Sequence, residues 1–175
     1  MSKTRFLNYL LLFLFTACSN GSGISNAEIP NDLMDRWVGT WNVEVTLKKS
    51  DLVPEEMNLK GTQTVKWILN KKFLQTTQSL AGGAFEKLSL TRYEPNEGVF
   101  LFWDFDSNGS FPMGITYGKW DKSKNEIALS GEYLGATGEG VVQFGGDDKV
   151  EVTFTVRSEE GTVLLDLEAS SEKSD

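Results

Sequence analysis

Two aspartates separated by one residue, Asp104 and Asp106, are the most conspicuous candidates for acid–base chemistry in the chain. Residues two apart on a β-strand lie on the same face, so both carboxylates can enter one cavity. Repulsion between their charges would favour a proton on one of them, as general acid–base catalysis requires. The pair is therefore one candidate catalytic site.

Two other interpretations of residues 104–110 stay open. Oxygen ligands at alternate positions before Gly109 resemble the start of a calcium-binding loop, but the twelfth position is Ile115, where a bidentate glutamate is needed. A strand that ends in the turn Asn108-Gly109 explains the same residues without any ligand. We favour the turn and expect no bound metal.

The absence of histidine narrows the remaining chemistry. Ser-His-Asp and Cys-His nucleophile systems are excluded, as is any metal site with a histidine ligand. We therefore expect that the protein binds no cofactor and is not an enzyme. Of the functions considered, an enzymatic activity that uses Asp104 or a tyrosine is the one we favour least.

The only cysteine, Cys18, follows a long apolar run. Lys3 and Arg5 precede the run and Ala17 is a small residue before the cysteine, as in a signal peptide. The run is shorter than the roughly 20 apolar residues that span a membrane. We expect residues 1–17 to be a signal peptide, and a lone cysteine leaves no internal disulfide.

Residues 14–18, Leu-Phe-Thr-Ala-Cys, resemble a bacterial lipobox, which implies cleavage before Cys18 and a lipid on its thiol. The mature protein would then be a lipoprotein with a membrane anchor of acyl chains such as palmitate. By resemblance to Gram-negative lipoproteins, Ser19 implies transfer to the outer membrane, so we expect a location in the cell envelope. The alternative is an ordinary secretory signal with a cysteine near its cleavage point.

Charge argues against a nucleic-acid partner. The formal net charge is −8, and it becomes about −10 without residues 1–17, which hold two basic residues and no acidic one. A phosphate backbone or an anionic leaflet would repel this surface. Membrane contact is therefore expected through the lipid anchor only.

The mature chain divides into three parts. Residues 18–29 are rich in Gly and Ser and predict a flexible tether. Residues 30–169 have the length of one ordinary domain. Residues 170–175 lack apolar periodicity and predict a disordered tail.

Within the domain, apolar residues alternate with polar ones in short runs, which is typical of strands with one buried face. Turn residues, as in 70–72 and 145–148, separate the runs at regular spacing. The pattern predicts an all-β, antiparallel up-and-down meander of about nine to ten strands, closed into a barrel that leaves no sheet edge. Residues 30–37 predict a short N-terminal helix that plugs one barrel end.

Residues 37–43, Trp-Val-Gly-Thr-Trp-Asn-Val, resemble the N-terminal signature of calycins, the lipocalin-like barrels. In such barrels Gly39 would let the chain approach closely at its entry and Trp41 would close the floor. An arginine late in the lipocalin barrel packs on this tryptophan, and Arg157 is the candidate here. No helix of the lipocalin kind follows the last predicted strand.

Three further stretches, 61–74, 90–95 and 98–131, resemble a widespread bacterial secreted family catalogued as a domain of unknown function. This resemblance covers most of residues 36–133. It implies a lipocalin-like barrel and brings no established activity.

We expect the barrel to bind a small apolar or amphipathic ligand. The predicted apolar wall consists of Trp41, Trp67, Phe85, Trp103, Met113 and Tyr117, and Arg92 or Arg157 would orient an anionic head group. The alternative is a non-enzymatic envelope lipoprotein with a filled barrel, which binds a protein partner on the outer face of residues 99–103, around Phe100 and Phe102. The volume of the barrel cavity distinguishes the two.

Overall fold

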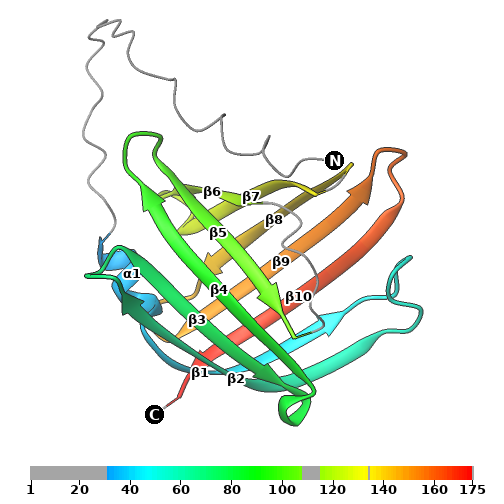
Figure 1. Cartoon of the computed structure of the whole chain (residues 1–175), viewed down its shortest axis with the longest axis horizontal. Coiled ribbons are helices and arrows are strands. Elements are labelled where there is room, and N and C mark those ends of the chain that lie inside the picture. The colour runs from blue at the N-terminus through cyan, green and yellow to red at the C-terminus, as the bar shows by residue number, and fades with distance from the viewer. Residues whose placement is uncertain (1–30, 108–114, 134, 175) are drawn as a thin grey trace, which may run out of the picture.

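The computed structural model describes residues 31–107, 115–133 and 135–174. These residues form one short α-helix, a single 3-10 turn and ten strands (Figure 1). Their bounds are α1 (Asn31–Trp37), β1 (Gly39–Leu47), β2 (Met57–Ile68), β3 (Phe73–Leu80), η1 (Ala81–Gly83), β4 (Phe85–Glu94), β5 (Val99–Asp106), β6 (Thr116–Asp121), β7 (Glu126–Tyr133), β8 (Ala136–Phe144), β9 (Lys149–Ser158) and β10 (Val163–Lys173).

The ten strands close into one antiparallel barrel in which each strand pairs with its neighbours in sequence and β1 pairs with β10. Closure gives every strand two partners, although β5 pairs with β6 over residues 99–102 only. The up-and-down barrel and the N-terminal helix predicted from the sequence are thereby confirmed.

Helix α1 covers one end of the barrel, which we call the closed end (Figure 1). Leu33 and Met34 are buried in the core, because their spacing along the short helix places both on its barrel side. Two indole N–H groups fix the helix: Trp41 Nε1 donates to the carbonyl of Trp37 at 2.9 Å, and Trp67 Nε1 donates to Asp35 Oδ1 at 2.7 Å. The predicted plug is therefore held by polar as well as apolar contacts.

The last strand differs from the prediction. Residues 170–173 are not a disordered tail, because β10 continues to Lys173 and pairs with β1 on one side and β9 on the other. Ser171 is buried opposite Val43 although it is polar. Backbone pairing in a closed barrel does not require apolar side chains, so the lack of apolar periodicity was a misleading signal.

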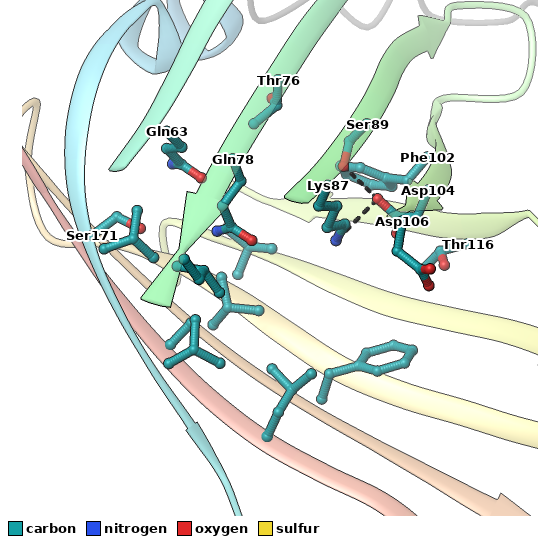
Figure 2. A pocket seen from close by; sticks show the side chains of 18 of the residues that line it. Gln63, Thr76, Gln78, Lys87, Ser89, Phe102, Asp104, Asp106, Thr116 and Ser171 are labelled. Carbon is teal, nitrogen blue, oxygen red and sulfur yellow. Dashed lines mark hydrogen bonds and ion pairs between the residues drawn. The ribbon is translucent and has the colours of Figure 1, made fainter. Parts of the chain in front are cut away.

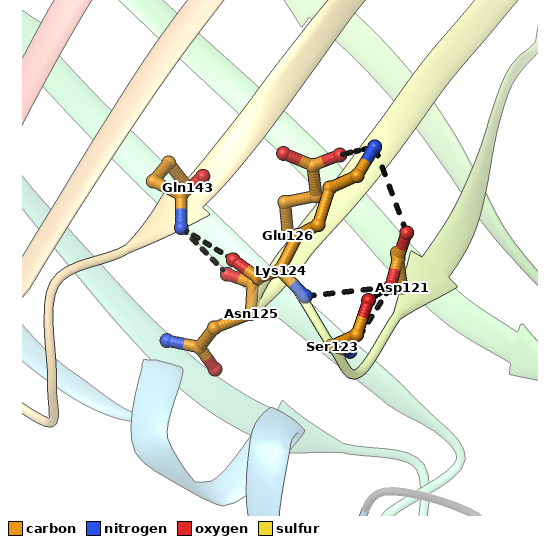
Figure 3. A network of polar contacts seen from close by, with 6 residues as sticks. All are labelled: Asp121, Ser123, Lys124, Asn125, Glu126 and Gln143. Carbon is orange, nitrogen blue, oxygen red and sulfur yellow. Dashed lines mark hydrogen bonds and ion pairs between the residues drawn. The ribbon is translucent and has the colours of Figure 1, made fainter.

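The turn between β6 and β7 shows how a polar segment is ordered at the closed end (Figure 3). Asp121 Oδ1 accepts hydrogen bonds from the hydroxyl and the backbone N–H of Ser123, at 2.7 and 3.0 Å, and from Lys124 N at 3.3 Å. Gln143 Nε2 on β8 donates to the carbonyl oxygens of Lys124 and Asn125. The bonds that Ser123 and Lys124 donate to Asp121, with the Ser123 hydroxyl as the largest cause, hold the pKa of Asp121 below its usual 3.8.

No helix in the described part of the chain is long and apolar enough to cross a membrane. The predicted signal peptide, Cys18 and the predicted tether all lie outside the described residues.

Candidate functional site

The barrel is hollow. A cavity of about 570 Å³ lies inside it, and all ten strands contribute lining residues. Trp37 of α1 lines the cavity at the closed end. The interior is therefore not filled by side chains, contrary to the alternative of a packed barrel.

One side of the cavity is polar. Eight polar residues of β2, β3, β4 and β5 line it, together with apolar residues of the same strands such as Leu80 and Phe85. We call the eight the polar wall, and Figure 2 labels all of them except Thr91: Gln63, Thr76, Gln78, Lys87, Ser89, Thr91, Asp104 and Asp106. Cross-strand register explains why they gather, because Gln78 stands opposite Gln63 on β2 and Lys87 on β4, and Lys87 stands opposite Asp106 on β5. Directly opposite residues in an antiparallel pair share one face. A polar residue at each of these positions therefore builds a continuous row across four neighbouring strands.

Asp104 is the centre of the hydrogen bonds on the polar wall (Figure 2). Its Oδ1 accepts from the Ser89 hydroxyl at 2.5 Å and lies 3.0 Å from Lys87 Nζ. Both charged side chains keep contact with solvent, with 36% and 46% of their surfaces exposed. Their ion pair therefore orients the two groups more than it stabilises the fold.

The opposite side of the cavity is apolar. Eleven aliphatic and aromatic side chains of β1, β8, β9 and β10 line it, and we call them the apolar wall: Val43, Val45, Leu47, Val142, Val150, Val152, Phe154, Val156, Leu165, Leu167 and Ala169. Ser171 is the single polar lining residue among these strands. Apolar surface on one side and hydrogen-bonding groups on the other is the arrangement that suits an amphipathic ligand.

A tyrosine and a threonine also line the cavity. Tyr133 Oη and Thr116 Oγ1 share a hydrogen bond of 2.5 Å. Burial raises the pKa of the Tyr133 phenol above its usual 10.0, the hydrogen bond with Thr116 opposes this, and the negative charge of Asp104 adds to it. Tyr133 therefore serves as a neutral hydrogen-bonding group at physiological pH.

Glycines make room for this tyrosine. A Cβ on Gly138 would lie 2.5 Å from the Tyr133 ring and 2.6 Å from the Phe154 ring. The two rings pack edge to face, with centroids 6.1 Å apart. Because Gly138 has no side chain, the two aromatic rings can occupy the space beside it and line the cavity.

Three of the predicted wall residues lie inside the barrel. Phe85 lines the cavity. Trp41 is fully buried and bonded to the Trp37 carbonyl, but it is not among the residues that line the cavity. Trp67 packs at the closed end through its bond to Asp35. Met113 lies outside the described residues.

Four predicted ligand-binding residues point outward, so their assignment to the cavity is wrong. Trp103 packs against Phe73 on the outer face, with ring centroids 6.1 Å apart, and Arg92 lies over the same Phe73 ring. Tyr117 is 44% exposed and Arg157 is also exposed. None of these residues can orient a ligand head group inside the barrel.

The prediction for Trp103 was wrong because residues 99–103 are all apolar. Alternation along this strand therefore does not show which residues face the barrel interior. The structure buries Phe100 completely and places Phe102 on the cavity, so these two do not form an outer strip. For Tyr117, the neighbouring Gly118 is the inward residue, because its missing side chain leaves space for Phe100 and Phe102.

The polar wall was missed apart from Asp104 and Asp106. A usable signal existed, since Lys87 and Ser89 are in phase with the inward Phe85, and Gln78 is in phase with Leu74 and Leu80. Polar residues in phase with buried ones mark either a cavity or a hydrogen-bonded core. Asp104 and Asp106 do share one face, as predicted, and both line the cavity.

The calcium interpretation depends partly on residues 108–114, which lie outside the described part of the chain. Among the described residues, no group of three or more His, Cys, Asp or Glu side chains is placed to hold a metal ion. The Ser89 hydroxyl and the Lys87 ammonium lie beside Asp104, and the chain has no histidine that could act with them as a general base.

Comparison with known proteins identifies a family and a fold. Residues 28–171 match the family described as "Protein of unknown function (DUF1579)". No curated protein matches the sequence.

Several solved structures share the barrel. Rv2717c from M. tuberculosis superposes with a TM-score of 0.65 at 15% identity, over 86% of this chain and 100% of that one. The S-type phycobiliprotein lyase CPES from Guillardia theta gives 0.57 at 10% identity, over 82% and 92%. A DUF3598 family protein of unknown function from Nostoc punctiforme gives 0.57 at 11% identity, over 81% and 48%. At these identities the likeness concerns the fold alone.

Proposed function

The chain belongs to the DUF1579 family, whose description names no activity, and we propose from the cavity itself that the barrel binds one small amphipathic molecule. The apolar part of the ligand lies against the apolar wall and its polar part contacts the polar wall. The observation that carries this proposal is the division of a single cavity into these two sides. A packed core would have no reason to place charged and amide groups on inward positions.

The cavity has the size of a ligand site. Its volume of about 570 Å³ lies within the range of roughly 300–1,000 Å³ that is usual for small-molecule pockets. The apolar wall supplies the binding free energy, at about 25 cal/mol for each Å² of apolar surface removed from water. The polar wall supplies selectivity, because a ligand without hydrogen-bonding groups would leave its side chains unpaired.

We propose a binding role and not catalysis. The phycobiliprotein lyase shares the barrel, but a likeness at this identity lends its activity no support here. Asp104 is already engaged by Ser89 and Lys87. Its contacts suit recognition of a ligand better than proton transfer to one.

A fluorescent probe tests the proposal. A neutral dye whose emission rises in apolar surroundings, such as N-phenyl-1-naphthylamine, should bind the purified protein saturably with one site per chain. Val152→Phe, which adds a ring to the apolar wall, should weaken binding strongly. Thr153→Phe adds the same ring to the outer face of the same strand and is the matched control.

Equal dye binding by the two variants would place the site outside the barrel and end the proposal. Unfolding curves of both variants show whether each remains folded, so loss of binding can be separated from loss of structure.

We further propose that the barrel is tethered to a bacterial envelope membrane, in the outer membrane if the cell has two, through a lipid on Cys18. The apolar run, its basic flank and the small residue before the cysteine support this. Cys18→Ser should move the protein from the membrane to the soluble fraction. A wild-type protein that is soluble and has no acyl mass would refute the anchor and leave the binding proposal intact.

A further inference from the structure

Negatively charged side chains outnumber positively charged ones in the described lining of the cavity. Among the described residues, its charged lining consists of the carboxylates of Asp104 and Asp106 and the ammonium of Lys87. The sum is one net negative charge inside the barrel. Lys87 is already paired and cannot serve as an isolated cation for a ligand, because its ammonium lies 3.0 Å from Asp104 Oδ1.

No arginine compensates this charge within the described lining. Arg92 is on the outer face and forms an ion pair with Glu94, at 2.7 Å. Arg157 is exposed at the opposite end of the barrel from α1. An anionic head group in the cavity would therefore meet two carboxylates and one cation that is already paired, and like charges brought together this way are strongly unfavourable.

Aromatic rings in the lining are a second feature that favours a positively charged ligand. Phe85, Phe102, Tyr133 and Phe154 all line the cavity. The face of an aromatic ring attracts a cation, most strongly where water is excluded. Tyr133 lines the same cavity as Asp104 and Asp106. Aromatic rings and carboxylates therefore face one enclosed space.

We propose that the cavity selects amphiphiles with a cationic head group, a primary amine or a quaternary ammonium on an apolar chain. The head group lies at the polar wall beside Asp104 and Asp106 and the chain lies along the apolar wall. This inference rests on the proposed binding function and adds the charge of the ligand to it.

Competition among ligands of one chain length tests the charge preference. Dodecyltrimethylammonium, dodecanol and dodecanoate, each below its micelle concentration, are used to displace N-phenyl-1-naphthylamine at pH 7 in physiological salt. The cation should bind at least about tenfold more tightly than the carboxylate, a difference of about 1.4 kcal/mol. Dodecanol should bind with intermediate affinity.

Two variants show where the preference arises. Asp106→Asn removes one negative charge from the cavity and should reduce the ratio of cation to carboxylate affinity severalfold. Glu86→Gln removes the same charge from the outer face of neighbouring β4 and should leave that ratio unchanged. This control matters because the whole protein is acidic and attracts cations from every side.

The outcomes separate the two proposals. If neither the dye nor dodecanol binds inside the barrel, the proposed function fails. If dodecanol binds and dodecanoate binds as tightly as the cation or more tightly, the function stands and the charge inference is overturned. Equal effects of the two variants would assign the preference to the surface and also overturn it.

Discussion

The ammonium of Lys173 lies 5.2 Å from the centroid of the Trp41 ring. The two residues are register partners on β1 and β10, so the end of the last strand covers the start of the first. Lys173 Nζ also donates a hydrogen bond to the carbonyl of Arg36 in α1, at 3.1 Å. Its side chain crosses Gly39, where a Cβ would lie 2.9 Å from Lys173 Cε. Lys173, and not Arg157, is therefore the cation that packs on the signature tryptophan.

Loss of this contact should weaken the closed end. Lys173→Met keeps the aliphatic stem but removes the cation over Trp41 and the hydrogen bond to α1, so we expect a loss of about 1–2 kcal/mol in the free energy of unfolding. Lys149→Met on the outer face of β9 should cost less than about 0.5 kcal/mol. Urea denaturation measures both values. Equal costs would mean that Lys173 contributes no more than a surface lysine.

Removal of the final residues should open the barrel. Truncation after Ala169 deletes the part of β10 that pairs with residues 41–44 of β1, and we expect a loss of at least about 3 kcal/mol from unmade hydrogen bonds and exposed core. Truncation after Lys173 should be tolerated, since it removes little beyond one backbone bond from Ser174 to Thr40. Thermal unfolding of the two proteins compares them. Identical melting temperatures would support a tail that is not part of the fold.

A side chain at Gly138 should disturb the aromatic pair in the cavity. Gly138→Ala forces Tyr133 and Phe154 apart and should cost about 1–3 kcal/mol of stability, as other overpacked positions do. The near-ultraviolet circular dichroism of the aromatic rings should change as well. Thr137→Ala, at the exposed neighbouring position, should alter neither. An unchanged spectrum for Gly138→Ala would show that the space beside Gly138 is larger than the structure indicates.

Tyr133 should make stability fall at alkaline pH. Because burial raises the pKa of the folded phenol above 10.0, the unfolded chain loses this proton first as pH rises. The contribution of Tyr133 is therefore fully present below pH 10 and is lost as pH rises through the pKa of the folded phenol. The difference in unfolding free energy between wild type and Tyr133→Phe should shrink over this range, measured by urea denaturation at several pH values. A difference independent of pH would contradict the shift.

Asp121 should act in the opposite direction at acid pH. Hydrogen bonds from Ser123 and Lys124 lower the pKa of the folded carboxyl below 3.8, so its contribution is present above that pH and is lost as pH falls through the folded value. Asp121→Asn removes this titration, and the stability of the variant should depend less on pH below 4 than that of wild type. Glu160→Gln in the exposed turn between β9 and β10 is the comparison. Parallel acid profiles for Asp121→Asn and wild type would argue against these bonds.

The family-like signature and the strand alternation predicted the barrel correctly because both are local properties. In β9, for example, Val150, Val152 and Val156 are inward as their spacing of two indicated. The site was predicted less well. Where both faces of a strand are apolar, as around Trp103, alternation cannot say which residues face inward, and that choice is made by pairing with neighbouring strands.

The sequence by itself determined the all-β class, the short N-terminal helix, the absence of histidine chemistry and the shared face of Asp104 and Asp106. Only the tertiary structure decided that Gln63, Gln78 and Lys87 join those carboxylates in one polar wall, and that the barrel encloses a cavity. The physical reason is that each inward position is set within one strand, whereas its neighbours come from cross-strand register and barrel closure. Both of these bring together residues that lie far apart along the chain.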